Sequence, residues 1–339
     1  MIEEIMAKIE SKTNLSEKEA EEVFTEIMRG DIPADRIAAF LLALKEKKET
    51  IEEITGAAMA MRRFATKIRT DKETVLDTCG TGGDKSDTFN ISTISAFVAA
   101  GAGCIVAKHG NKAVSSRCGS ADLLEELGIN INVGKETVER CIAEAGIGFL
   151  FAPSLHLAMK YAMPARRMIK TRSIFNILGP LTNPAGARYQ ILGVYDEGLV
   201  ETMARVLKNL GSQRAMVIYG KDGLDEVTTA KETIVAELKD GKIKIYTIKP
   251  EEFGMERVSA EELKGGDPAL NAKIAAEILN GEKGARRDIT VLNSACAIYI
   301  TGLAASIGDG IEKAQDSIDS GRAMAKLGKL KELTNWFET

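Results

Sequence analysis

The first 70 residues carry hydrophobic side chains at helical spacing and contain no strand-like run. A capping box formed by Ser16 and Glu19 predicts the start of one helix. Apolar residues then recur every three or four positions over 20–28, and Gly30 is placed to end the helix. The pattern predicts a small all-helical N-terminal domain over residues 1–72.

From residue 73 onward the pattern changes to short apolar runs separated by helical stretches. The runs lie at 75–79, 104–107, 148–151, 191–195 and 215–219. Runs spaced one helix apart predict βα units around a largely parallel sheet. Two further runs, 234–238 and 243–248, flank Asp240-Gly241, which is a hairpin signal, so we expect a mixed sheet. The fold class predicted is α/β, with a large α/β domain over 73–339.

One stretch interrupts this alternation. Residues at about 163–185, hereafter the returning segment, are rich in Arg, Lys and Pro. We interpret them as the place where the chain returns to the helical domain. After the last expected strand, the final 70 residues are again helical, with a helix predicted to start at Asp267-Pro268 and to end at Asn280-Gly281.

Charge and cysteine content narrow the function classes. The chain has 45 Lys and Arg against 49 Asp and Glu, a net charge of -4, which argues against a general nucleic-acid binder. Its five cysteines show no metal-binding or disulfide spacing, which favours a reducing, cytoplasmic setting. The acidic N-terminus does not resemble a signal peptide, and the uncharged stretches 88–107 and 289–308 are too polar to favour spanning a membrane.

The first candidate site follows the first predicted strand, where residues 77–84 read DTCGTGGD. Three glycines in four positions allow close approach of a ligand to backbone N–H groups, although an ordinary tight turn has the same composition. The loop is neither a Walker A nor a Rossmann motif. Asn90, Ser92 and Thr93 then precede a helix of small residues, and such groups at a helix N-terminus favour phosphate.

The second candidate lies at the end of the second predicted strand, where residues 108–111 read KHGN. Strand ends carry ligands in open α/β sheets, and Lys108 would supply a point charge for a phosphate. A lone lysine is more often solvated, but its place beside His109 and Asn111 favours the binding interpretation. Polar residues continue through 115–122, where Ser120 is placed as a helix cap.

Two further clusters add charge. Asp225 and Glu226 follow the run at 215–219 and would suit Mg²⁺, although two such carboxylates in a loop are commonly only solvated. Arg166 and Arg167, with Arg172 nearby, would bind a substrate carboxylate if one pointed into a cleft, and otherwise form helix salt bridges. Together the clusters suit a reaction that holds a phosphorylated sugar and neutralises its leaving group without a covalent enzyme intermediate.

These motifs, in this order, resemble the anthranilate phosphoribosyltransferase family of tryptophan biosynthesis, one of the nucleoside phosphorylase-like phosphoribosyltransferases. The matching stretches are GTGGD (80–84), NIST (90–93), KHGN (108–111), SSRCGSAD (115–122), RSIFNILGPLTNPA (172–185), GLDEVT (223–228), GGDP (265–268) and RDITVLNSA (287–295). The resemblance implies a cleft between the two domains, a cytoplasmic homodimer, and no nucleic-acid or membrane partner. It implies transfer of the 5-phosphoribosyl group from 5-phosphoribosyl 1-diphosphate to the amine of anthranilate, with Mg²⁺, expected as two ions.

The resemblance also assigns roles by position. Contacts to the sugar diphosphate fall on Gly80, Gly83, Asp84, Thr88, Asn90, Ile91, Ser92, Thr93, Lys108, Asn111, Ser115, Ser116 and Ser120. Metal ligands fall on Ser92, Asp225 and Glu226. Anthranilate contacts fall on Gly80, Asn111, His156, Arg166 and Pro180. Lys108, His109 and Arg166 are the candidate catalytic residues, with His109 a candidate proton acceptor.

The chain departs from the family pattern at three positions that flank the expected anthranilate site. Leu157 replaces a usual proline, Lys170 a glycine and Ser173 a threonine. Two other functions stay open. A pyrimidine nucleoside phosphorylase would use phosphate as the attacking group and would not need the Asp225-Glu226 site. A non-enzymatic nucleic-acid-binding relative should show a basic groove and eroded metal ligands.

Overall fold

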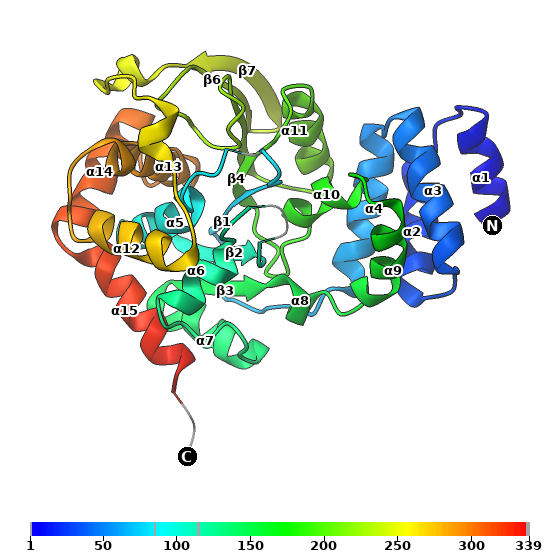
Figure 1. The fold of residues 1–339 in the computed structure, drawn as a ribbon, viewed down its shortest axis with the longest axis horizontal. Coiled ribbons are helices and arrows are strands. Elements are labelled where there is room, and N and C mark those ends of the chain that lie inside the picture. The colour runs from blue at the N-terminus through cyan, green and yellow to red at the C-terminus, as the bar shows by residue number, and fades with distance from the viewer. Residues whose placement is uncertain (1, 85, 114–115, 337–339) are drawn as a thin grey trace.

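The computed structural model describes residues 2–84, 86–113 and 116–336 (Figure 1). The N-terminal helices are α1 (Ile2–Glu10), α2 (Glu17–Arg29), α3 (Ala34–Lys47) and α4 (Ile51–Phe64). The capping box of Ser16 with Glu19 is present, and Gly30 ends α2 in the left-handed conformation, as predicted. Helix α9 (Met159–Ile169), far along the chain, packs against α2 and α3. The short helix α10 (Phe175–Leu178) adds Phe175, whose ring meets Phe24 edge-on at 5.7 Å.

A seven-stranded sheet forms the centre of the larger part. Its strands, in spatial order, are β3 (Ile147–Phe151), β2 (Ile105–Gly110), β1 (Val75–Gly80), β4 (Tyr189–Gly193), β5 (Arg214–Gly220), β6 (Thr233–Lys239) and β7 (Lys242–Ile248). The first five strands in this order are parallel, and β6 and β7 add two antiparallel pairings. The mostly parallel mixed sheet is therefore confirmed.

The fourth strand begins and ends earlier than the hydrophobic run at 191–195 predicts. It ends at Gly193, and the N–H of Tyr195 donates to the side chain of Thr81 (3.1 Å) rather than to a neighbouring strand. The N–H of Val194 still donates to the carbonyl of Ile218 in β5 at 3.0 Å, so the chain turns away from the sheet at Tyr195. The backbone of Asp225 lies directly against Gly193 at this strand end.

Both faces of the sheet are covered, because successive side chains of a strand point to opposite sides. Ile191 and Met216 belong to one core, and their neighbours Leu192 and Val217 to the other. The remaining helices are α5 (Ile91–Gly101), α6 (Ser120–Glu126), α7 (Lys135–Ala145), α8 (Ala152–Leu155), α11 (Leu199–Asn209), α12 (Pro268–Leu279), α13 (Ala285–Ile300), α14 (Ile307–Asp319) and α15 (Arg322–Thr334). Short 3-10 turns are η1 (Gly179–Leu181), η2 (Pro250–Phe253) and η3 (Ala260–Leu263).

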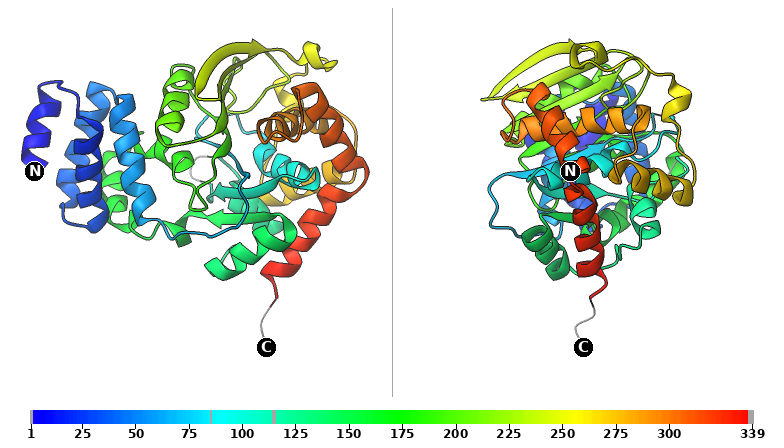
Figure 2. Two further views of the ribbon diagram at one scale, coloured as in Figure 1. Left: turned by 180° about the vertical axis from the view of Figure 1, so that it is seen from behind. Right: turned by 90° about the vertical axis from the view of Figure 1, so that its left-hand side faces the viewer.

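The helical parts of the two uncharged stretches, α5 and α13, are buried inside the larger part, whereas most of 302–308 is exposed. Helices α5 and α13 pack against each other beneath the sheet, and most of their residues are inaccessible to solvent. Within the described residues, no helix is both long and apolar enough to cross a membrane. Seen from behind, the N-terminal helices and α13 to α15 lie at opposite ends of an elongated molecule (Figure 2). The carboxyl ends of β1, β2, β4 and β5 meet at one edge of the sheet, and the candidate residues follow them.

Candidate active site

The glycine loop after β1 lies against Asp225. Gly82 and Gly83 both adopt left-handed backbone conformations, with φ of 64° and 79°, which favour glycine. The N–H of Gly82 donates to Oδ2 of Asp225 at 2.9 Å. A Cβ at Gly80 would lie 2.3 Å from that same oxygen, so glycine is needed there as well. The loop and the acidic pair predicted from separate motifs therefore share one site.

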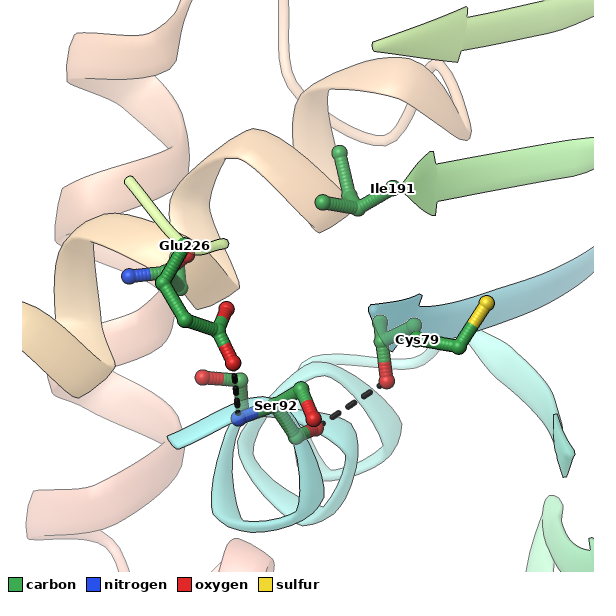
Figure 3. A pocket seen from close by; sticks show the side chains of 7 residues that line it. Cys79, Ser92, Ile191 and Glu226 are labelled. Atoms are coloured by element: carbon green, nitrogen blue, oxygen red, sulfur yellow. Dashed lines mark hydrogen bonds between the residues drawn. The ribbon is translucent and has the colours of Figure 1, made fainter. Parts of the chain in front are cut away.

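Glu226 lies beside the first turn of α5. Its Oε1 accepts the N–H of Ser92 at 3.0 Å (Figure 3). Behind it, the side chain of Asn293 in α13 holds the backbone of Val227. Its Oδ1 accepts the N–H of Val227 at 2.9 Å, and its Nδ2 donates to the carbonyl of Val227 at 2.8 Å. A small pocket opens between these groups. It is lined by Thr78, Cys79, Ser92, Ser95, Ile191, Glu226 and Asn293.

Lys108 is buried beneath the same helix terminus. Its Nζ donates to the carbonyl of Thr78 and to the hydroxyl of Ser92, at 3.3 Å in the second case. Burial lowers the pKa of the ammonium group, and the negative charge of Asp77 opposes that shift. Only 3% of Lys108 is exposed, so the alternative of a solvated surface lysine does not apply.

The two carboxylates repel one another. Burial, together with the charge of Asp84, raises the pKa of Asp225 to about 7, and burial with the charge of Asp225 raises that of Glu226 to about 8. This excess of unbalanced carboxylate oxygen fits a hard divalent cation. Within the described residues, no group of three or more His, Cys, Asp or Glu side chains could hold a metal on its own. A cation here would take its other ligands from water or phosphate, which is how Mg²⁺ commonly binds.

The second predicted loop is joined to the first. Asn90, which precedes α5, donates to the carbonyl of Cys118 at 3.1 Å and accepts from Asn271 of α12 at 3.0 Å. Ser120 accepts the N–H of Asn111 at 3.2 Å. Ser116 is exposed in the same loop, and Ser115 lies outside the described residues.

The side chains of four other predicted contact residues, Asp84, Thr88, Ile91 and Thr93, are bonded to other residues or buried. Thr88 forms an isolated bridge with Lys264, and Asp84 accepts a hydrogen bond from Ser86. The side chains of Ile91 and Thr93 are both buried inside the protein, at about 1% exposure. Any contact they make to a ligand would therefore come from the backbone.

A buried network that sequence reasoning missed supports the KHGN loop. Asp77 accepts the N–H of His109 at 3.0 Å and the side chain of Asn183 at 2.8 Å. Asn183, from the returning segment, also donates to the carbonyl of Ala107 at 2.8 Å. Burial raises the pKa of Asp77. The network ties the end of β2 to the returning segment.

His109 and His156 lie together, with ring centroids 5.0 Å apart. Burial lowers the pKa of His109 to about 3 and that of His156 to about 4. The Nε2 atoms of both rings are buried without a hydrogen-bond partner among the described residues. With so low a pKa, His109 is a weak proton acceptor near neutral pH.

The arginines of the returning segment separate. Arg166 is half-buried on α9, with its guanidinium 5.6 Å from the ring centre of Phe175. Arg167 is exposed. Arg172 instead stacks on Tyr195 at 3.9 Å and donates to the carbonyl of Gly83. Pro180 is buried, and its carbonyl accepts from Gln190 at 2.7 Å.

The three departures from the family pattern surround this segment. Leu157 is 63% exposed. Lys170 ends α9 with a φ of 45°, in the left-handed region where glycine is favoured. Ser173 is buried, and its N–H donates to Asn176 at 3.0 Å. Of the three, only Lys170 carries an evident backbone cost.

Comparisons with known proteins identify relatives of both parts of the chain. Residues 72–324 match the α/β domain of a glycosyl transferase family, and residues 3–65 match the helical bundle domain of a glycosyl transferase family. The anthranilate phosphoribosyltransferase of Geobacter sulfurreducens is 52% identical over 349 aligned positions, covering 99% of this chain and 100% of the relative. That of Methanobrevibacter smithii is 51% identical, with the same coverage.

Solved structures show the same fold. The anthranilate phosphoribosyltransferase of Thermus thermophilus is 40% identical, with a TM-score of 0.93 over 98% of this chain and 99% of that chain. The enzyme of Saccharomyces cerevisiae, in complex with PRPP and Mg, is 29% identical, with a TM-score of 0.90 over 98% and 97%. The yeast enzyme has also been solved with 4-fluoroanthranilate, at 27% identity and a TM-score of 0.86 over 97% and 98%.

Proposed function

The chain belongs to the anthranilate phosphoribosyltransferase family, and from that premise we propose how its own residues divide the reaction. The reaction transfers the 5-phosphoribosyl group from 5-phosphoribosyl 1-diphosphate to the amine of anthranilate and releases diphosphate. It is the second step of tryptophan biosynthesis from chorismate. The glycine loop, the start of α5 and the KHGN loop bind the sugar diphosphate, and the returning segment binds anthranilate.

One observation carries this division of roles. The acidic pair touches both halves of the phosphate site, because Asp225 accepts from Gly82 and Glu226 accepts from Ser92. Among the described residues, the N–H groups of Gly83 and Asp84 have no hydrogen-bond acceptor. Free N–H groups beside a helix N-terminus suit phosphate oxygens, and adjacent carboxylates suit the cation that accompanies them.

The residues present fit Mg²⁺. Its ligands from this chain would be the hydroxyl of Ser92 and the carboxylates of Asp225 and Glu226, and we propose two ions. When bound, Mg²⁺ supplies positive charge that stabilises the departing diphosphate. The raised pKa values of the two carboxylates support this assignment, because a bound cation would relieve their repulsion.

Lys108 adds a second positive charge at the same place. Its ammonium group is held under the first turn of α5 by Thr78 and Ser92. There it would stabilise the negative charge of the leaving diphosphate. As the bond from C1 to diphosphate oxygen breaks, positive charge develops on the ribose ring and the amine of anthranilate attacks C1. Prepositioned charge of this kind needs no reorganisation during the reaction.

The returning segment orients the acceptor. Arg166 and Asn111 hold the anthranilate carboxylate, while His156 and Pro180 lie near its ring. Such positioning contributes roughly several kcal/mol in well-oriented reactions. The proton released by the amine goes to the departing diphosphate rather than to His109, whose pKa of about 3 makes it the weaker base.

We also propose that the enzyme acts as a homodimer in the cytoplasm. Helices α3 and α9 pack side by side and expose apolar side chains, with Leu42 45% and Met168 56% exposed. Exposed apolar side chains on neighbouring helices are typical of a surface that another chain covers. Sedimentation of the purified protein would test this.

The function is tested by fluorescence. Purified enzyme with Mg²⁺ and 5-phosphoribosyl 1-diphosphate should consume the fluorescence of anthranilate, and chelation of Mg²⁺ should stop the reaction. A parallel reaction with thymidine and phosphate should give no thymine. Thymine release without loss of anthranilate would replace the proposal by nucleoside phosphorolysis.

A further inference from the structure

Arg172 and Tyr195, from two different segments of the chain, both contact the glycine loop. Arg172 comes from the returning segment, six residues after Arg166, and Tyr195 follows β4. The guanidinium of Arg172 lies 3.9 Å from the ring centre of Tyr195, close enough for a strong cation–π contact. The same guanidinium donates to the carbonyl of Gly83. Both side chains are half-buried.

Tyr195 is attached to the loop a second time through its backbone. Its N–H donates to the hydroxyl of Thr81 at 3.1 Å, and the N–H of Thr81 donates to the carbonyl of Gly193 at 2.9 Å. The loop is thus held at its start by β4 and at Gly83 by Arg172. A Cβ at Gly83 would lie 2.9 Å from the guanidinium, so the contact leaves no room for a side chain.

Holding the carbonyl of Gly83 also orients the next N–H group. In a trans peptide the C=O and the following N–H point in opposite directions. The hydrogen bond from Arg172 therefore turns the N–H of Asp84 away from Arg172 and fixes it. Loss of the hydrogen bond would free this peptide to rotate, since glycine tolerates many backbone conformations.

We propose that Arg172 is a positioning residue for the diphosphate-binding loop, with Tyr195 as its platform, and that it does not bind the anthranilate carboxylate. The inference rests on the proposed function and adds that the arginines of the returning segment serve different substrates. Arg166 contacts the acceptor, while Arg172 acts on the sugar diphosphate through the backbone of Gly83.

The test compares KM values for the two substrates. Arg172→Ala should raise the KM for 5-phosphoribosyl 1-diphosphate about tenfold or more, as expected for losing a hydrogen bond from a charged donor. The KM for anthranilate should stay within about twofold. Arg172→Lys, which keeps a charged donor, should lie between wild type and alanine. Arg205→Ala, at an exposed arginine of α11, is the matched control and should match wild type.

Tyr195 provides an independent variant. Tyr195→Phe keeps the ring but removes the hydroxyl that hydrogen-bonds to Arg172, so it should raise the KM for 5-phosphoribosyl 1-diphosphate only slightly. Tyr195→Ala should raise that KM as much as Arg172→Ala does. The double variant should be less impaired than the product of the two single effects, because both remove one contact. Melting temperatures check folding, and Arg172→Lys with Tyr195→Phe carry the comparison if an alanine variant does not fold.

Two failures are distinguishable. A wild-type enzyme that makes no product overturns the proposed function. If wild type is active, three results for Arg172→Ala overturn only the role of Arg172. These are unchanged KM values for both substrates, a loss of kcat alone, and a rise in the KM for anthranilate that equals or exceeds the rise for 5-phosphoribosyl 1-diphosphate.

Discussion

Gly80 and Asp225 lie so close together that Gly80 has no room for a side chain, since a Cβ there would lie 2.3 Å from Oδ2 of Asp225. Gly193, which pairs with Gly80 in the sheet, is even closer, because its Cβ would lie 1.6 Å from the carbonyl oxygen of Asp225. The ends of the adjacent strands β1 and β4 therefore both carry glycine where the loop that contains Asp225 passes over them. The position of Asp225, which we propose as a metal ligand, depends on both glycines.

Gly193→Ala should displace Asp225 and disable the enzyme. We expect kcat/KM to fall at least ~100-fold, because small displacements at a reacting centre cost that much. Stability should fall by roughly 1–3 kcal/mol, as in other overpacked sites. The measurements are steady-state kinetics and urea unfolding. As a control, Gly328→Ala, on the exposed side of α15 with no atom within 4 Å, should stabilise by about 0.5–1 kcal/mol.

Glu226→Gln should weaken the binding of Mg²⁺. Removing one negative ligand should raise the Mg²⁺ concentration for half-maximal rate by about tenfold or more, since even residues supporting metal ligands change affinity by 10–100-fold. Initial rates across a Mg²⁺ titration measure this. Glu232→Gln, a carboxylate of the same loop that pairs with Lys221 instead, should leave the titration unchanged. Equal curves for both variants would remove Glu226 from the metal site.

Local sequence patterns predicted much of the fold and the loops of the candidate site. Hydrophobic strands can be recognised from their own composition, and the polar residues of the candidate site follow them directly in sequence. Lys108 and the pair Asp225-Glu226 could therefore be identified before any contact was known, and the structure brings them to one place. The bounds of β4 differ by two residues at each end from the apolar run, because the N–H of Tyr195 bonds the distant Thr81 of the glycine loop and not a strand.

The supporting contacts could not be predicted in this way, because they join residues far apart in sequence. Asn183 reaches Asp77 across 106 positions, and Arg172 reaches Gly83 across 89. Asparagine and arginine have no periodic signal that indicates a distant partner. The NPA stretch at 183–185 and the arginine of RSIFN were visible as motifs, but their partners follow only from the topology.

The two buried histidines contribute stability that is lost in acid, opposite in sign to the contribution of Asp225 and Glu226, whose pKa values are raised. His109 and His156 have pKa values of about 3 and about 4, below the ordinary value of 6.5. The unfolded chain therefore binds protons that the folded chain does not, and stability is lost as pH falls from about 6.5 towards 4. His156→Asn removes one of these groups. The stability of this variant relative to wild type should therefore rise between pH 7 and pH 5, as urea titrations at the two pH values would measure. A difference from wild type that does not change with pH would contradict the assignment.

Lys170→Gly should stabilise the end of α9. Lys170 has a φ of 45°, and a residue with a side chain pays about 1 kcal/mol or more in this region, whereas glycine does not. We expect an increase in unfolding free energy of about 1 kcal/mol, measured by urea denaturation. Lys170→Ala is the matched control, because alanine retains the backbone cost and should give no such gain. Equal stability of the glycine and alanine variants would show that the left-handed backbone at position 170 carries no such cost.

Arg166→Ala should raise the KM for anthranilate and leave that for 5-phosphoribosyl 1-diphosphate nearly unchanged. A guanidinium that binds a carboxylate contributes charge-assisted hydrogen bonds, so the increase should be about 10–100-fold. Steady-state kinetics with each substrate varied in turn measure both constants.

Within the described part of the chain, Arg166 of α9 contacts Phe175 and Met163 and not the glycine loop. Its effect should therefore be the mirror image of that expected for Arg172. Anthranilate lacking its carboxylate, that is aniline, should discriminate poorly between wild type and Arg166→Ala, because the group that Arg166 binds is already absent. If both KM values stay put in Arg166→Ala, the acceptor carboxylate is held elsewhere, and the exposed Asn111 at the end of the KHGN loop becomes its principal anchor.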